Sequence, residues 1–231
     1  PPLSQKGGTP LLFQNTMKLL QKYGMNFLTG LGTTLLLALI SVAIGCVIGA
    51  LVAIMRLSKS KVLRSIATVY TEVIRDTPLL LQLYFFYFLL PDILPALKLS
   101  KFACITIALV INSGAYMSEV FRSGIQSIDR GQTEAARSLG LSSRQTMMRI
   151  VLPQAFKNVL PAMCNEFVAV TKETSLASTF YVGDLMTQYQ TISGKTYLVI
   201  EPLIIIGIIY FVVTFTMSKL ITVLERRLKS D

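Results

Sequence analysis

Long apolar stretches with few or no charged residues recur along the chain. The first, Tyr23–Met55, has no Asp, Glu, Lys or Arg, and a helix needs only about 20 apolar residues to cross a bilayer. This length favours membrane-spanning helices over buried strands, which rarely exceed about eight residues. Three further stretches have the length and apolarity of a span: Phe102–Ser118, Ile150–Thr171 and Thr196–Ser218.

A shorter apolar stretch, Thr77–Pro91, is preceded by a segment with helical periodicity. One face of that segment carries Val62, Ile66, Val69, Tyr70 and Val73, and Thr77-Pro78 predicts a kink or a break. Either an interfacial helix precedes a short span, or one kinked span covers both segments. Both arrangements give an all-α integral membrane fold with five transmembrane helices.

Composition supports a membrane protein without its own catalytic site. Hydrophobic residues make up 52% of the 231 residues and charged residues only 15%, against roughly 25% charged in a soluble domain. The chain has no histidine, and its three cysteines lie in apolar stretches without metal-ligand spacing. We therefore predict no metal site, no cofactor held by this chain and no enzyme activity.

The net charge of +10 reflects mainly the membrane topology. Basic residues are concentrated after the first span, between the third and fourth spans, and at the C-terminus, which the positive-inside rule assigns to the cytoplasm. With five spans, the N-terminus lies outside and the C-terminus inside. Residues 1–25 then form an extracellular leader, either flexible or an interfacial helix, and residues 26–231 form the transmembrane domain.

The segment EAARSLGLSSRQTMMRI, from Glu134 to Ile150, predicts two short helices joined by a tight turn. Asp129 can cap the first helix, with Gln132 reaching back to it. Gly140 suits the left-handed position that ends a helix. Ser142 can cap the second helix with Gln145, and Pro153 marks where the next element starts or bends.

A helix-turn-helix of this kind can read DNA, but its position argues against that function. A recognition helix must enter the major groove, whereas this hairpin is held against the bilayer by a span at each end. Its apolar face suits a protein groove better than phosphates. The sequence therefore favours docking to a protein partner, with no nucleic acid.

The same segment resembles the EAA loop of ABC importer permeases. Glu134-Ala135-Ala136, Gly140 and Ile150-x-Leu152-Pro153 carry this resemblance. The polar amino-acid branch of the family is further matched by these segments: Arg75–Leu80, with Asp76 where glycine is usual; Gly114-Ala115-Tyr116, Glu119, Arg122, Gly124-Ile125 and Gly131-Gln132; and Lys172–Leu176. The resemblance covers roughly residues 26 to 228.

The resemblance implies a permease subunit with the type I importer fold, in a bacterial cytoplasmic membrane. Its cytosolic coupling-helix hairpin, about residues 126–153, would dock separate ATPase subunits that bind ATP and Mg²⁺. The expected coupling residues are Glu134, Ala135, Ala136, Gly140 and Leu141. A second permease subunit, identical or related, and an extracellular or periplasmic solute-binding protein would complete the importer.

Polar residues inside spans are candidates to line a solute path. Asn112, Tyr116 and Glu119 share one helical face, and Glu166, Lys172 and Glu173 lie on the fourth span. Glutamates can bind the ammonium of an amino acid, and Lys172 or Arg75 its carboxylate. The alternative is structural, with Glu119 paired to Arg122, and Glu173 paired to Lys172 or to a neighbouring subunit.

Two other functions stay open at this stage. One is a channel or secondary transporter that does not use ATP, and the other is a membrane-tethered helix-turn-helix regulator. The preferred function is ATP-driven import of a polar amino acid such as glutamine, glutamate or arginine, through alternating access. The sequence does not select among these substrates.

Overall fold

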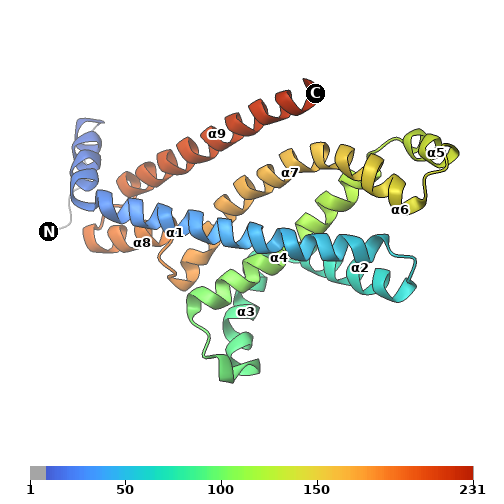
Figure 1. Cartoon of the computed structure of the whole chain (residues 1–231). Coiled ribbons are helices and arrows are strands. Elements are labelled where there is room, and N and C mark those ends of the chain that lie inside the picture. The colour runs from blue at the N-terminus through green and yellow to red at the C-terminus, as the bar shows by residue number, and fades with distance from the viewer. Residues whose placement is uncertain (1–8, 231) are drawn as a thin grey trace.

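The computed structural model describes residues 9–230, and every regular element in that range is a helix (Figure 1). In chain order the elements are α1 (Thr9–Leu57), α2 (Lys61–Arg75), α3 (Leu79–Ile93), the 3₁₀ turn η1 (Pro95–Leu97), α4 (Lys101–Gln126), α5 (Arg130–Ser138), α6 (Ser143–Thr146), the π-helical turn η2 (Met147–Val151), α7 (Leu152–Glu173), the 3₁₀ segment η3 (Thr174–Phe180), α8 (Leu185–Thr196) and α9 (Ile200–Ser230).

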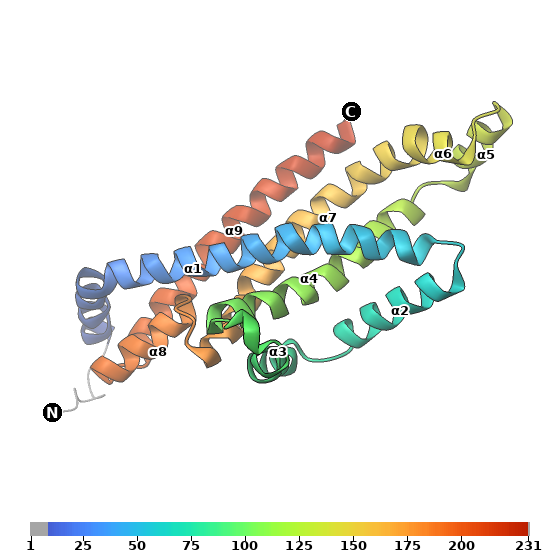
Figure 2. The same ribbon diagram turned by 60° about the horizontal axis from the view of Figure 1, so that its bottom comes forward.

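The long helix α1 begins well before the predicted first span. It is helical from Thr9, and its first turns stand at an angle to the rest (Figures 1 and 2). Leu19 is buried against the start of α9, and Asn15 Nδ2 donates to Glu201 Oε1 at 3.1 Å. The chain is therefore helical from Thr9 onward, and the extracellular or interfacial position of the leader stays a prediction. Residues 1–8 of the leader lie outside the described range.

The predicted break at Thr77-Pro78 is present. Helix α2 ends at Arg75, α3 begins after Pro78, and the two helices meet at 105°. Proline disfavours the helical conformation of the residue before it, so the chain cannot continue α2 through Thr77. The buried side of α2 carries Ala67 and Thr71, whereas the predicted apolar face is exposed, including Val62, Ile66, Val69 and Val73.

Helices α1 and α4 share the most extensive contact of the described residues and pack closely. A Cβ placed on Gly45 would lie 2.8 Å from Ser113 Oγ, and one on Gly49 would lie 2.5 Å from Met117 Cβ. Such distances are shorter than van der Waals contact, so only glycine lets the two helices approach this closely. The G-x-x-x-G pair is thus used within the chain.

Gly49 should be intolerant of even one methyl group. We expect Gly49→Ala to lower the free energy of unfolding by about 1–3 kcal/mol, the usual cost of overpacking. Gly32→Ala is the matched control, because a Cβ there has no atom within 4 Å and alanine favours a helix by roughly 0.5–1 kcal/mol. Thermal unfolding in detergent should shift down for the first variant only; equal shifts would show that the α1–α4 contact is not tight.

Helix α8 was not foreseen. The sequence placed the start of the fifth span at Thr196, whereas the structure has a separate helix over Leu185–Thr196 and begins α9 at Ile200. Asp184 caps α8 by accepting from the Met186 backbone N–H at 3.0 Å. Leu185 and Ile192 then pack with Phe27, Ile205 and Ile206, which ties α8 to α1 and α9.

Three described helices are long and apolar enough to cross a membrane: α1, α4 and α9. The bent pair of α2 and α3 adds a fourth span if it is counted as one. The 22 residues of α7 reach about 33 Å, but α7 is not among the helices that are apolar enough to cross a membrane by composition. The multi-pass fold is therefore confirmed, and the count of five spans stays a prediction.

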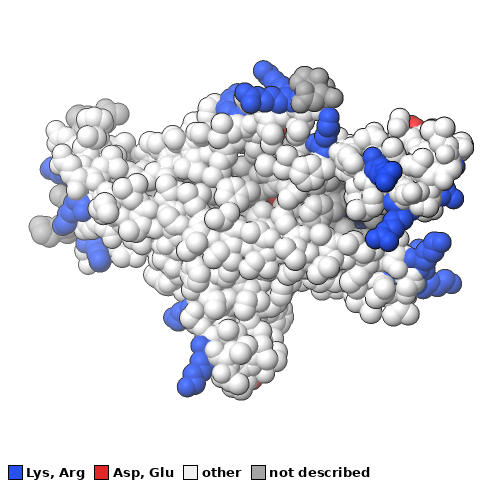
Figure 3. All heavy atoms as spheres, in the orientation of Figure 1, with Lys and Arg blue, Asp and Glu red and all other residues white. Residues whose placement is uncertain are grey.

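Basic side chains gather at the two ends of the molecule in this view, at the top over the end of α9 and at the bottom beside α3, and more of them at the end with α5 and α6 (Figure 3). That end also carries the α1–α2 link and the last turns of α9 (Figure 2). The rest of the surface in this view has few charged atoms. The orientation of the two termini stays a prediction.

Candidate functional site

The hairpin of α5 and α6 projects from one end of the helix bundle (Figures 1 and 2). Asp129 caps α5, as predicted, by accepting from the Gly131 N–H at 2.7 Å. Gln132 uses its backbone N–H to bond the Asp129 carbonyl at 3.1 Å, whereas its side chain was expected to complete a capping box. The start of α5 is therefore fixed by one side-chain bond.

Gly140 ends α5 in the left-handed conformation, with φ of +83°. The Gly140 N–H bonds the Arg137 carbonyl at 3.0 Å, and the Leu141 N–H bonds the Ala136 carbonyl at 3.1 Å. This pair of bonds is the Schellman motif, which satisfies the last carbonyls of the helix. The predicted glycine turn is confirmed.

The second helix of the hairpin begins with the predicted capping box. The Ser142 hydroxyl accepts from the Gln145 N–H at 3.2 Å, and the Gln145 amide oxygen accepts from the Ser142 N–H at 2.8 Å. Pro153 was expected to mark where the next element starts or bends, and α7 begins there, with the proline in its first turn. Helical structure continues without a gap from α6 through η2 into α7, so the hairpin is joined directly to a core helix.

The coupling residues predicted from the sequence fall into two groups. Glu134, Ala135 and Gly140 are exposed on the hairpin, whereas Ala136 is buried and Leu141 is partly buried. The exposed residues can meet a partner, and the other two hold the hairpin together. Leu139 was not among the predicted residues, although its side chain is 81% exposed beside the turn; a leucine directly before a helix-ending glycine was the available sequence signal.

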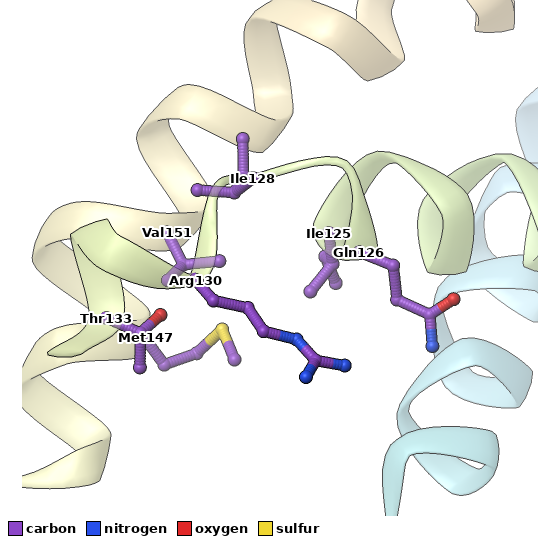
Figure 4. A pocket seen from close by; sticks show the side chains of 7 residues that line it. All are labelled: Ile125, Gln126, Ile128, Arg130, Thr133, Met147 and Val151. Atoms are coloured by element: carbon purple, nitrogen blue, oxygen red, sulfur yellow. The ribbon is translucent and has the colours of Figure 1, made fainter.

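A cavity of about 490 Å³ separates the hairpin from the end of α4. Figure 4 shows the Arg130 side chain extending from the start of α5 into this space, with Met147 and Val151 of η2 on one side and Ile125 and Gln126 on the other. Helix α5 packs on the rest of the chain chiefly through α6 and η2. The hairpin is therefore supported from one side only.

Asn112, the first residue of the predicted solute-path stripe, belongs to a buried hydrogen-bond network. Its Nδ2 donates to Gln82 Oε1 at 3.0 Å, and Gln82 Nε2 donates to the carbonyls of Ile74 and Thr77 at 2.7 and 3.2 Å. Such carbonyls lose their helical partners at a break and are costly to leave unbonded in a membrane. Asn112 and Gln82 thus hold the α2–α3 break against α4.

Glu119, at the other end of the stripe, lies among three arginines. It forms ion pairs with Arg56 of α1 and Arg122 of α4, and Arg75 Nη1 of α2 is 3.8 Å away. The Arg75 guanidinium also lies over the Tyr116 ring, 5.5 Å from its centroid. The structural pairing of Glu119 with Arg122 is present, and it joins three helices at the basic end of the bundle.

The polar residues of α7 are less constrained. Glu166 and Glu173 are partly buried and Lys172 is exposed. Neither glutamate forms a salt bridge among the described residues, in contrast to Glu119. The predicted Glu173–Lys172 pair is therefore not formed as a direct contact. These two carboxylates keep the capacity to bind a cationic group.

The comparison with protein families is made on this geometry. Residues 45–230 match the family of binding-protein-dependent transport system inner membrane components. The chain belongs to this family. The resemblance drawn from the hairpin motif is thereby confirmed, and multi-pass membrane location follows from the same membership.

Relatives in this family are similar along most of their length. The arginine transport system permease protein ArtQ of Bacillus subtilis is 40% identical over 204 residues, which are 88% of this chain and 93% of the relative. The probable glutamine ABC transporter permease protein GlnM of the same organism is 39% identical, with 89% and 94% covered. The nopaline transport system permease protein NocM of Agrobacterium fabrum is 41% identical, with 86% of each chain covered.

Solved structures give the same fold. A crystal structure of an amino acid ABC transporter with histidines superposes with a TM-score of 0.84, at 43% identity, over 90% of this chain and 96% of that one. An inward-facing structure of the MetNI methionine ABC transporter has a TM-score of 0.71 at 16% identity, over 88% and 98%. The second likeness concerns the fold alone.

The distant partners of the Asn112–Glu119 stripe could not be found from sequence spacing, unlike Arg122, which is one helical turn from Glu119. Gln82 lies 30 residues from Asn112, and Arg56 lies 63 residues from Glu119. The available signal was that Gln82 and Arg56 are polar residues in or beside apolar stretches, where such a side chain needs a polar partner.

Proposed function

We propose that this chain is the permease subunit of an ATP-driven importer that moves a polar amino acid into the cell. The observation that carries the proposal is the exposed hairpin with its Gly140 turn, joined to the core helix α7. Relatives named for arginine, glutamine and nopaline, and an amino acid transporter structure at 43% identity, support the substrate class. The particular amino acid stays open.

The hairpin end is the cytoplasmic end in this proposal. Basic side chains gather there (Figure 3), as the positive-inside rule requires of cytoplasmic segments. The start of α1 and the α8–α9 link then face outward, and the C-terminal end of α9 faces the cytoplasm. The relatives are bacterial, which supports the bacterial plasma membrane as the location.

Separate ATPase subunits would bind ATP and Mg²⁺ and dock on the hairpin. Four exposed arginines surround the docking surface, at positions 130, 137, 144 and 149, and Leu139 stands beside its turn. A groove that accepts this surface needs an apolar base and acidic walls. This chain would contribute no residue to hydrolysis.

The importer would contain a second permease subunit, identical or related, and an extracellular or periplasmic solute-binding protein. Large apolar side chains exposed on α3 and α9, among them Phe85, Phe88, Phe211 and Phe215, support burial in lipid or against the second subunit. Docked ATPases would then tilt the two permeases as rigid bodies and alternate access to the solute.

The solute path is proposed to follow α7. Glu166 and Glu173 would face the ammonium group of an amino acid, and Lys172 its carboxylate. Contacts within the chain already give a structural reason for Asn112, Tyr116 and Glu119. Arg75 contacts both Tyr116 and Glu119 and stays partly exposed. A path along their stripe stays a weaker prediction.

The docking proposal can be tested by cross-linking. We expect Leu139→Cys to form a cross-link to the ATPase subunit with a short thiol–amine reagent, because Leu139 is the most exposed apolar residue of the hairpin. Lys59→Cys, in the α1–α2 link at the same end, is the control and should react less. Wild-type protein measures the background from Cys46, Cys104 and Cys164.

Equal cross-linking of Leu139→Cys and Lys59→Cys would contradict docking on the hairpin. A protein that transports amino acids while no ATPase subunit is present would instead support the channel or secondary-transporter alternative. Binding of duplex DNA by the wild-type protein would support the regulator alternative.

The α7 carboxylates should matter for transport and little for folding. We expect Glu166→Gln and Glu173→Gln each to lower uptake at least fivefold, because the amide keeps the shape but loses the charge. Melting temperature in detergent should stay within a few degrees, since neither carboxylate has an ion-pair partner to lose. Asp92→Asn on exposed α3 is the control; unchanged uptake in both α7 variants would remove α7 from the path.

A further inference from the structure

The π-helical turn η2 lies between the hairpin and the core helix α7. Its widened bonding is visible in the Leu152 N–H, which bonds the carbonyl of Met147 five residues earlier. An α-helix would bond the carbonyl four residues earlier. Turns of this kind are rare and often lie at functional sites, and here the turn interrupts an otherwise continuous helical run from Ser143 to Glu173.

Pro153 gives the turn a physical cause. Proline has no N–H to donate, and its ring would collide with the carbonyl of the residue four positions earlier, which is Arg149. Widening the helix just before Pro153 relieves that collision. The Gln154 side chain supplies part of the missing bonding, because its Nε2 donates to the Ile150 carbonyl at 2.9 Å.

The turn also sets the direction in which the hairpin points. One residue corresponds to about 100° of rotation in an α-helix, so a π turn, which accommodates an additional residue, rotates everything before it relative to α7. With the turn in place, Val151 is buried, Met147 lines the cavity and Met148 is exposed. Relaxation to an α-helix would change this arrangement.

Apart from η2, the hairpin is held by the short link of residues 127–129 to α4, where Asn158 Nδ2 donates to Ser127 Oγ at 3.0 Å. The cavity of about 490 Å³ lies between the hairpin and the end of α4 (Figure 4), and α5 is supported chiefly by α6 and η2. A free space on one side allows the hairpin to turn about the α7 axis. The geometry of η2 is therefore the main constraint on its direction.

We propose that Pro153 is a positioning residue that sets the rotation of the coupling hairpin about the α7 axis through the π turn. The proposal rests on the proposed function, because the rotation matters when an ATPase subunit docks on the hairpin. Movement of the docked ATPase is then transmitted along the rigid α6–η2–α7 run to Glu166 and Glu173.

The test uses the complete importer in liposomes and measures amino acid transported per ATP hydrolysed. Pro153→Ala restores the missing N–H and removes the ring, so the turn relaxes to an α-helix and the ratio falls at least fivefold. Pro161→Ala is the control, since it removes a proline inside α7 away from the π turn, and it should leave the ratio within twofold of wild type.

A second variant separates rotation from loss of structure. Pro153→Ala combined with deletion of exposed Met148 gives a plain α-helix in which Thr146 and Val151 again face the same side. We expect this variant to regain at least half of the wild-type ratio. A wild-type ratio in Pro153→Ala, or no recovery in the deletion variant, would overturn the positioning role. Absence of ATP-driven uptake in the wild-type complex would instead contradict the proposed function itself.

Discussion

Gly140→Val should lower ATP-driven uptake at least tenfold while the protein still folds and inserts. Gly140 has φ of +83°, and a β-branched residue in this region is a genuine outlier that costs about 1–2 kcal/mol or more. The hairpin would open its Schellman turn to avoid that strain and lose the shape that the ATPase meets. Uptake and ATPase stimulation in liposomes measure the effect.

A valine at position 140 would strain the backbone without colliding with neighbouring residues. A second substitution can therefore separate the effect of backbone strain from that of side-chain volume. A Cβ at this position meets no atom within 4 Å, so side-chain volume alone should be tolerated. Asparagine adopts the left-handed conformation more readily than valine, and Gly140→Asn should keep most of the uptake. Similar uptake by the valine variant and wild type would show that the turn has no role in coupling.

Glu119→Gln should cause the largest loss of stability among the polar substitutions in the bundle. Three arginines from α1, α2 and α4 surround the carboxylate, whose side chain is 23% exposed. Removing one partner of a buried ion pair costs about 3–5 kcal/mol, and partial exposure reduces this to roughly 2 kcal/mol. We expect a melting temperature several degrees below wild type in detergent.

Two variants make this prediction specific. Glu72→Gln on the exposed side of α2 removes an acidic charge outside the cluster and should leave the melting temperature unchanged. Glu119→Asp keeps the charge on a shorter side chain and should recover part of the loss. A Glu119→Gln protein that melts at the wild-type temperature but fails in uptake would contradict the structural role and indicate that Glu119 lines the solute path.

Features determined by neighbouring residues were predictable from the sequence. The Ser142–Gln145 capping box, the left-handed Gly140 and the break before Pro78 each depend on residues within one or two turns, and all three are present. Docking of the hairpin to a protein partner, inferred from the flanking spans and the basic residues, stays a prediction.

Features determined by distant residues were not predictable. Asn112, Tyr116 and Glu119 share a helical face, as the spacing indicates, but that face meets the α2–α3 break because α3 departs at 105°. Spacing along one helix carries no information about that angle. Helix α8 was likewise not predicted, because its sequence is rich in polar residues. Asp184 followed by Thr187 was nevertheless an available capping signal.

The central claim is most directly tested by uptake into liposomes that contain this permease, its ATPase subunits and its binding protein. Each candidate amino acid is supplied outside the liposomes with the binding protein, and ATP or a non-hydrolysable analogue is enclosed with the ATPase subunits. The account predicts accumulation of a polar amino acid only with hydrolysable ATP, and its loss in Gly140→Val. Accumulation that ignores ATP and follows an ion gradient would contradict it.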